Sequence, residues 1–151
     1  METKDILQAQ FVQHWHSNME RSPKCDFYRN YKLVFEFENY LDIVPSKVYK
    51  VILKYRTCNH KLPIETGRYA NIERRYRICP HCNLQKVGDE FHYLFECSHP
   101  EITEARESYL PVYYRNNVCV AKFYNLMQSL DSDQILNSLH KFVKVIFDIV
   151  C

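Results

Sequence analysis

The chain has 151 residues, 46% of them hydrophobic and 25% charged, which is typical of one globular domain. Only Gly67 and Gly88 are glycines, which argues against glycine-rich phosphate loops, dinucleotide-binding turns and turn-dense β-sandwiches. The net charge is only +2. No P-loop, nucleophile-elbow or HExxH pattern occurs, so most common enzyme classes are excluded.

The N-terminal third predicts two helices separated by an ambiguous stretch. Apolar residues at near-helical spacing predict an amphipathic helix over residues 4–20, ended by Ser22 and Pro23. Residues 28–37 fit a strand or a helix equally well. A second helix is expected to begin near Pro45, with its apolar face formed by Val48, Val51, Ile52 and Tyr55.

From residue 59 onwards the sequence predicts an irregular segment followed by three helices. Residues 59–63 form a connection, and residues 64–78 look extended or loop-like. Helices are expected over residues 101–114, over 119–129, and from an N-cap at Ser132 towards the C-terminus. The aromatic residues expected in the helical core are Phe11, Trp15, Phe123, Phe142 and Phe147.

Targeting signals are not evident. The N-terminus is charged and leads into no apolar segment, so it is not a signal peptide. No apolar run approaches the ~18 residues of a membrane span, and no membrane partner is expected. Seven cysteines, an odd number, without a secretory signal favour a reduced, intracellular protein, nuclear or cytoplasmic. In that setting clustered cysteines are expected to be metal ligands rather than disulfides.

The strongest motif is C-x2-C-x9-H-x4-C, formed by Cys79, Cys82, His92 and Cys97. Three thiolates and one imidazole saturate a tetrahedral Zn²⁺, which predicts a structural and not a catalytic site. Five residues along an ideal α-helix turn through about 140°, so the helix that carries His92 must end or loosen before Cys97. His99 remains an alternative to Cys97 as the fourth ligand.

Three segments carry a resemblance to a known family. They are the run YRTCNHKLPIETGRY at residues 55–69, ICPHC at 78–82 and DEFHYLFEC at 89–97. Together they closely resemble the C-terminal region of non-LTR (LINE-type) retrotransposon polyproteins, downstream of the reverse transcriptase. The similarity extends over about residues 10–125. It implies the same four metal ligands and a module that binds nucleic acid, often the element's own RNA.

The chain lacks the catalytic parts of such polyproteins. It has no Y/F-x-D-D polymerase motif and no acidic constellation of an endonuclease or RNase H. We therefore expect a retroelement-derived fragment without catalytic activity of its own.

A basic segment precedes and enters the cysteine motif. Residues 47–77 hold nine Lys or Arg against Glu65 and Glu73, a net charge of +7. Basic side chains contact phosphates and interleaved aromatic rings stack on the bases of single strands. The predicted nucleic-acid-binding residues are Arg56, His60, Lys61, Arg68, Arg74, Arg75, Tyr76 and Arg77.

The sequence thus predicts a mainly α single domain over residues 1–151, with a small C-C-H-C zinc knuckle and a short β-hairpin. Its parts are an N-terminal helical part (1–54), the basic segment and knuckle (55–99) and C-terminal helices (100–151). The predicted function is zinc-dependent binding of single-stranded RNA or DNA. Two alternatives remain: a protein-interaction scaffold with a purely structural zinc, which docks a partner through the apolar helix at Val143–Val150, or an inactive retroelement remnant.

Overall fold

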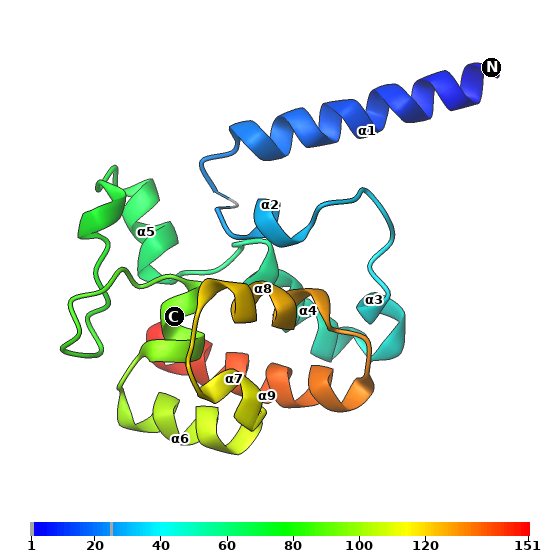
Figure 1. Cartoon of the computed structure of the whole chain (residues 1–151). Helices are drawn as coiled ribbons and strands as arrows, with labels where there is room; N and C mark the ends of the chain where they lie inside the picture. The colour runs from blue at the N-terminus through cyan, green and yellow to red at the C-terminus, as the bar shows by residue number, and fades with distance from the viewer. Residues whose placement is uncertain (1, 25) are drawn as a thin grey trace.

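A computed structural model describes residues 2–24 and 26–151, and helices dominate this part of the chain. The predicted mainly α class is confirmed. The helices are α1 (Thr3–Arg21), α2 (Tyr28–Tyr31), α3 (Tyr40–Ile43), α4 (Ser46–Arg56), α5 (Pro63–Tyr69), η1 (Arg74–Tyr76), η2 (His92–Glu96), α6 (Pro100–Tyr109), α7 (Val112–Arg115), α8 (Val120–Gln128) and α9 (Asp133–Val150). Figure 1 shows their arrangement.

The main helix packing in the described chain is that of α9 against α4 and α6 (Figure 1). The predicted N-cap is confirmed, because the Ser132 hydroxyl accepts a hydrogen bond from the Ile135 amide at 3.3 Å. The buried face of α9 is formed by Leu136, Leu139, Phe142, Val143 and Ile146. Within Val143–Val150, Val143 and Ile146 face this core, while the other apolar residues are half-buried: Val145, Phe147, Ile149 and Val150.

An aromatic cluster joins α8 to the middle of the chain. The ring centroid of Phe123 lies 5.1 Å from that of Phe27 and 5.9 Å from those of Phe91 and Phe95. Edge-on contacts at such distances are favourable. They attach the segment that leads into η2 to the helical core.

The buried face of α4 continues one residue further than the apolar pattern. Val48, Ile52 and Tyr55 are buried as predicted, and Arg56, four residues after Ile52, is also buried, with 3% of its surface exposed. Its guanidinium donates to Glu38 Oε1 at 3.0 Å and to the Met127 carbonyl at 3.1 Å, and lies 5.0 Å from the Tyr31 ring centroid. Arg56 is thus a core residue, and its predicted role in nucleic-acid binding is wrong.

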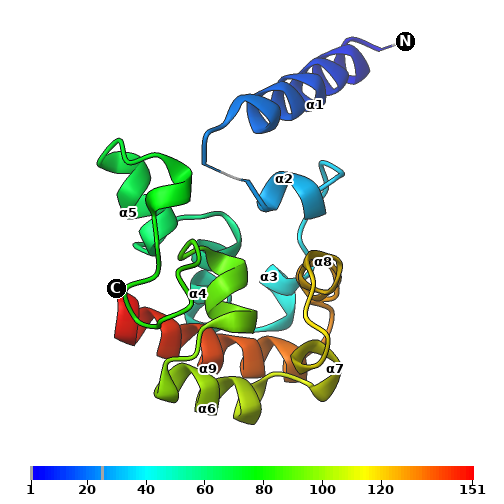
Figure 2. The same ribbon diagram turned by 60° about the vertical axis from the view of Figure 1, so that its left-hand side comes forward.

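Helix α1 forms where it was predicted but buries none of its residues. Figures 1 and 2 both show it lying apart from the other helices. The predicted core positions of Phe11 and Trp15 are wrong, since these rings contact only the edge of the fold, with centroids 5.3 and 5.4 Å from that of Phe35. Spacing predicts that a helix has an apolar face, but not that another element covers it.

Two other expectations are corrected, and one open alternative is decided. Residues 63–69 form α5 rather than an extended segment, because Pro63 occupies the first turn, where its missing N–H costs nothing. Residues 28–37 contain the short helix α2 and no strand. The helix expected over 101–114 is divided into α6 and α7 at Pro111, whose ring and missing N–H are incompatible with a helix interior.

The predicted short β-hairpin is not formed in the described part of the chain. An isolated antiparallel bridge between Ile78 and Val87 is what remains. It is flanked by hydrogen bonds from the Cys79 amide to the Lys86 carbonyl and from the Gly88 amide to the Arg77 carbonyl, both 2.9 Å. On one side of the bridge the chain then turns through the cysteine motif, and on the other it turns towards α5. A longer ladder is therefore prevented.

None of the helices within residues 2–24 and 26–151 combines the length and the apolar character that a bilayer crossing requires.

Two phenylalanines test which helices carry the stability. Phe142 is 0% exposed and Phe11 is 58% exposed. We expect Phe142→Ala to lower the free energy of unfolding by about 3–5 kcal/mol, because it leaves a cavity in the core. Phe11→Ala should cost less than about 1 kcal/mol, the contribution of one exposed aromatic contact. Urea denaturation followed by circular dichroism measures both, and equal losses would contradict a peripheral α1.

Candidate metal centre

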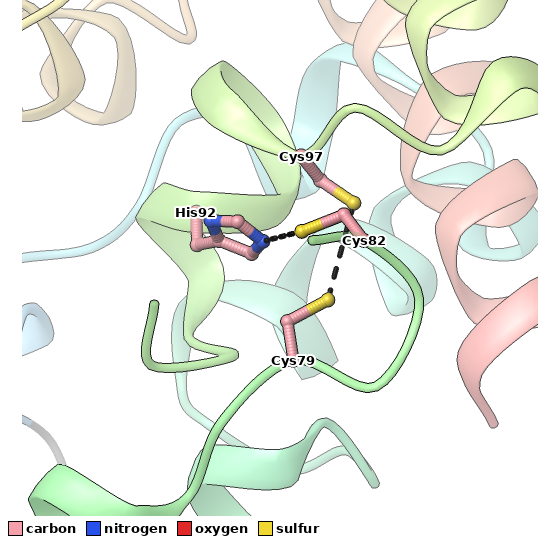
Figure 3. Close-up of side chains that lie close together, drawn as sticks. All are labelled: Cys79, Cys82, His92 and Cys97. Atoms are coloured by element: carbon pink, nitrogen blue, oxygen red, sulfur yellow. Dashed lines mark hydrogen bonds between the residues drawn. The ribbon is translucent and has the colours of Figure 1, made fainter. Parts of the chain in front are cut away.

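Four side chains from two turns of the chain converge on one point. Cys79 and Cys82 come from the loop after η1, while His92 and Cys97 lie at the start and just beyond the end of η2 (Figure 3). One donor atom from each residue lies within 4.8 Å of the others. Cys79, His92 and Cys97 are buried and Cys82 is half-buried. The predicted ligand set is therefore assembled in space, and it can hold a metal ion.

The spacing of the donors suits a tetrahedral ion. Bond lengths of about 2.3 Å to sulfur and 2.0–2.1 Å to nitrogen place two sulfurs about 3.8 Å apart and a sulfur and a nitrogen about 3.6 Å apart. The Cys79 and Cys97 sulfurs are 4.0 Å apart, and the Cys82 sulfur is 3.4 Å from His92 Nε2. These two separations lie within a few tenths of an ångström of the tetrahedral values, and the remaining donor pairs lie within 4.8 Å, so the group is close to the arrangement that one ion requires.

The first pair of ligands is positioned by a tight turn. The His81 amide donates to the Cys79 sulfur at 3.4 Å, and the hydrogen bond from the Cys79 amide to the Lys86 carbonyl fixes the base of the turn. Gly88, on the returning side, approaches Pro63 so closely that an added Cβ would lie 2.8 Å from the proline ring. Glycine is thus required for the returning chain to pack against α5.

The second pair is positioned by a π-helical turn. In η2 the Cys97 amide donates to the His92 carbonyl at 2.7 Å, an i→i+5 bond instead of the α-helical i→i+4 bond. This wider turn brings side chains five residues apart towards one side. The prediction that the helix loosens before Cys97 is confirmed, and Cys97, not His99, is the member of the four-donor group.

Two carboxylates that are not among the four donors, Asp89 and Glu96, orient His92. Its amide donates to Asp89 Oδ1 at 2.8 Å, and its Nδ1 lies 3.4 Å from Glu96 Oε2, while Nε2 faces the cysteines. A carboxylate that accepts from the second ring nitrogen fixes the tautomer with its Nε2 lone pair free for a metal. Burial raises the pKa of Asp89 to about 6, and Arg74 lies 3.3 Å from its other oxygen and opposes that shift.

The thiols interact strongly with one another. The contact with Cys97 lowers the pKa of Cys79 to about 3, and the His81 amide acts in the same direction. The pKa of Cys97 is raised by the same contact and by burial. Burial lowers the pKa of His92, but contacts with Cys79 and Cys82 outweigh it and raise the value overall. The group thus favours a thiolate at Cys79, the form that binds metal.

An unpaired buried hydroxyl also points to a charged centre. Tyr93 is fully buried and its hydroxyl has no hydrogen-bond partner among the described residues. Its pKa is raised by burial and, next, by the contact with Cys79. A metal-bound thiolate at Cys79 would be an acceptor for this hydroxyl, so the donor set and its surroundings fit a bound metal.

Arg106 of α6 holds the far end of the centre. Its buried guanidinium donates to the carbonyls of Leu94 at 2.7 Å, Cys97 at 2.9 Å and Tyr93 at 3.1 Å. The wide turn leaves these carbonyls without helical partners. Arg106 therefore acts as a C-terminal cap for η2. No motif predicted this role, because the partners lie nine to thirteen residues away.

A second group, Cys58, His60 and Glu90, also has donor atoms within 4.8 Å of one another. Here His60 Nε2 lies only 2.7 Å from Glu90 Oε1, whereas two ligands of one tetrahedral ion lie about 3.4 Å apart. The Leu62 amide donates to Nδ1 at 3.3 Å, so Nε2 carries the proton given to Glu90. The pair is a buried hydrogen bond that fixes the 58–62 segment against the knuckle.

The predicted nucleic-acid-binding residues divide into two groups. Arg56 and His60 have buried side chains, and Arg77 is engaged by the protein, donating to the Ile72 carbonyl at 2.8 Å and the Ile64 carbonyl at 3.0 Å. All three contact the fold, but His60 and Arg77 as whole residues are half-buried rather than part of the core, and their contact with nucleic acid stays a prediction. The residues that remain at or near the surface are Lys61, Arg68, Arg74, Arg75 and Tyr76.

Carboxylates accompany three of the remaining arginines. Arg68 pairs with Glu65 at 3.0 Å, Arg75 with Glu73 at 3.0 Å, and Arg74 with both Asp26 and Asp89 at 3.2 and 3.3 Å. Folding thus places two carboxylates from outside the basic segment, Asp26 and Asp89, beside Arg74, which weakens the local positive potential. Two arginines also lie over aromatic rings, Arg68 over Tyr69 at 4.3 Å and Arg75 over Tyr76 at 4.8 Å.

Comparison of the chain with protein-family models, curated proteins and solved structures finds no match. The resemblance to the retrotransposon region therefore rests on the motif residues alone and stays a prediction.

We expect the purified protein to hold one tightly bound metal ion per chain. Cys82→Ser should remove it, because the serine hydroxyl is a poor ligand for a thiolate site. Cys119→Ser is the matched control, since Cys119 is exposed and outside the group. Metal analysis by mass spectrometry measures the stoichiometry, and full metal retention in Cys82→Ser would contradict the assignment.

Arg106→Lys should destabilise the protein by about 2–3 kcal/mol, because an ammonium group cannot reach three carbonyls at once and leaves some of them buried without a donor. It should also weaken metal retention against a chelator. Arg75→Lys, at an exposed position, is the control and should change neither property. A stable Arg106→Lys variant with unchanged metal retention would exclude the capping role.

Proposed function

We propose that this chain is a zinc-stabilised module that binds single-stranded nucleic acid and has no catalytic activity of its own. The observation that carries the proposal is a pair of exposed tyrosines, each with an arginine over its ring, beside the metal centre. Tyr69 is 71% exposed and Tyr76 is 62% exposed. Exposed rings of this kind stack on unpaired bases, and the adjacent cations attract phosphates.

The metal centre would fix these two pairs in place. The Arg77 carbonyl accepts from Gly88 on the returning chain, and the Ile64 amide of α5 donates to the Gly88 carbonyl at 3.1 Å. The Arg77 side chain also donates to the carbonyl of Ile64, in the first turn of α5, and to that of Ile72, just after α5. The knuckle is thus linked directly to the segment that carries Tyr69 and Tyr76.

Zinc is the ion that we propose for the centre. Three thiolates and one imidazole in a tetrahedron are typical of structural zinc sites, whereas ions that favour octahedral oxygen coordination, such as Mg²⁺ and Ca²⁺, prefer other donor sets. When bound, zinc would hold the four ligands together. Because they fill its coordination shell, no position remains for a water nucleophile, which supports a binding role over a hydrolytic one.

The charges on this face suit weak, exchangeable contacts with phosphate. Lys61 is exposed, and the Arg75–Glu73 pair is exposed on both sides. Such a surface pair contributes little and can be replaced by a phosphate contact. The family resemblance supports the same conclusion, because it implies a module that binds the RNA of its own element.

A protein-docking role is the second candidate, and a specific observation favours it. Four apolar residues between α2 and α3 are exposed: Leu33, Val34, Phe35 and Phe37. Exposed apolar groups in one short segment are typical of protein contact sites. In that case zinc would be purely structural and nucleic acid would not bind.

The proposal is tested by fluorescence anisotropy of the zinc-loaded protein with short labelled single-stranded RNA, single-stranded DNA and duplex. We expect single strands to bind more tightly than duplex and more weakly as salt rises. Arg75→Gln should lower the log–log salt slope by about 0.7, the value for one phosphate contact on a single strand. Arg21→Gln, at an exposed position of α1, is the control. Folded, zinc-loaded protein that binds none of the three probes would refute the proposal.

A further inference from the structure

A small cleft opens between the end of α4 and α5. It has a volume of about 240 Å³ and is lined by Lys24, Cys58, Asn59, His60, Lys61 and Tyr69. This is below the roughly 300–1,000 Å³ of sites for drug-sized ligands, so the cleft suits one planar ring system. No carboxylate lies among these lining residues, in contrast to the cleft around Arg74, which Asp26, Glu65 and Glu90 line.

One wall of the cleft is a fixed aromatic ring. Glu65 receives two hydrogen bonds from the Arg68 guanidinium, at 3.1 and 3.0 Å, and the guanidinium lies 4.3 Å from the Tyr69 ring centroid. The ring is held although it is largely exposed. A ring that is already held in place loses little freedom when a base stacks on it.

The other walls provide polar groups suited to a nucleotide. Asn59 has an amide with donors and an acceptor, the groups that recognise the edge of a base. Lys24 and Lys61 supply cations for phosphates. His60 is fixed by Glu90 and the Leu62 amide, and Cys58 has a left-handed backbone with φ 60°. The segment 58–61 is therefore shaped so that successive residues line the cleft.

We propose that this cleft binds one unstacked base of a single strand, with the base stacked on Tyr69 and the neighbouring phosphates at Lys24 and Lys61. The inference rests on the proposed function and deepens it, because it assigns a base-binding site in addition to general attraction for phosphates. The ligand class is a nucleotide within a strand, since a base alone would leave both lysines unused.

The test measures binding of a short labelled oligouridylate and a short labelled oligoadenylate to the zinc-loaded full chain. Tyr69→Ala should weaken binding about tenfold, within the range found for one base stacked on an aromatic ring. Tyr69→Phe keeps the ring and should bind within about twofold of the unchanged protein. The matched control is Tyr113→Ala. Tyr113 is 60% exposed, has the Lys122 ammonium 4.5 Å from its ring centroid, and belongs to α7 rather than to α5.

A second probe separates stacking from charge. An oligomer of abasic sugar phosphates has the phosphates without the bases, so Tyr69→Ala and the unchanged protein should bind it equally. Lys61→Gln should weaken both probes alike and lower the salt slope by about 0.7. If the unchanged protein binds the oligonucleotides but Tyr69→Ala behaves like Tyr113→Ala, the base site is refuted while the proposed function stands. If the unchanged protein binds no strand, both are refuted.

Discussion

The convergence of Cys79, Cys82, His92 and Cys97 is the constraint on which the middle of this molecule depends. Between the end of α5 and the start of η2 the described chain has one 3₁₀ turn and one isolated bridge as regular structure. Too few backbone hydrogen bonds and buried apolar side chains lie there to order the segment by themselves. A metal ion held by all four donors would supply the missing free energy, as it does in other small metal-stabilised folds.

The consequences reach both neighbours of the centre. On one side, Gly88 and Arg77 link the knuckle to α5, so the face that carries Tyr69 and Tyr76 is fixed through the metal site. On the other side, Arg106 caps the π-helical turn and joins it to α6, which packs against α9. The centre is thus a junction between a helical core and an exposed, partly basic face, and the proposed binding role would depend on an ion at the centre that orders this face.

Local pattern predicted the parts of this structure that depend on local chemistry. The ligand spacing, the loosened turn before Cys97, the cap at Ser132 and the buried residues of α4 follow from short-range geometry. The features that it missed concern distant partners. Arg56 is buried because its guanidinium donates to Glu38 and to the Met127 carbonyl, 18 and 71 residues away in the sequence. The side chain of His60 is buried because its ring pairs with Glu90, 30 residues away. A basic residue beside a metal motif looks the same in sequence whether such a partner exists or not.

The most direct measurement is amide hydrogen exchange on the metal-loaded protein and on the protein after chelation. We predict that amides of residues 63–97 lose protection without metal, because their order depends on the four ligands. Those of α4 and α9 should keep most of their protection, because apolar packing holds these helices. Unchanged protection of residues 63–97 after complete removal of the metal would contradict the central claim.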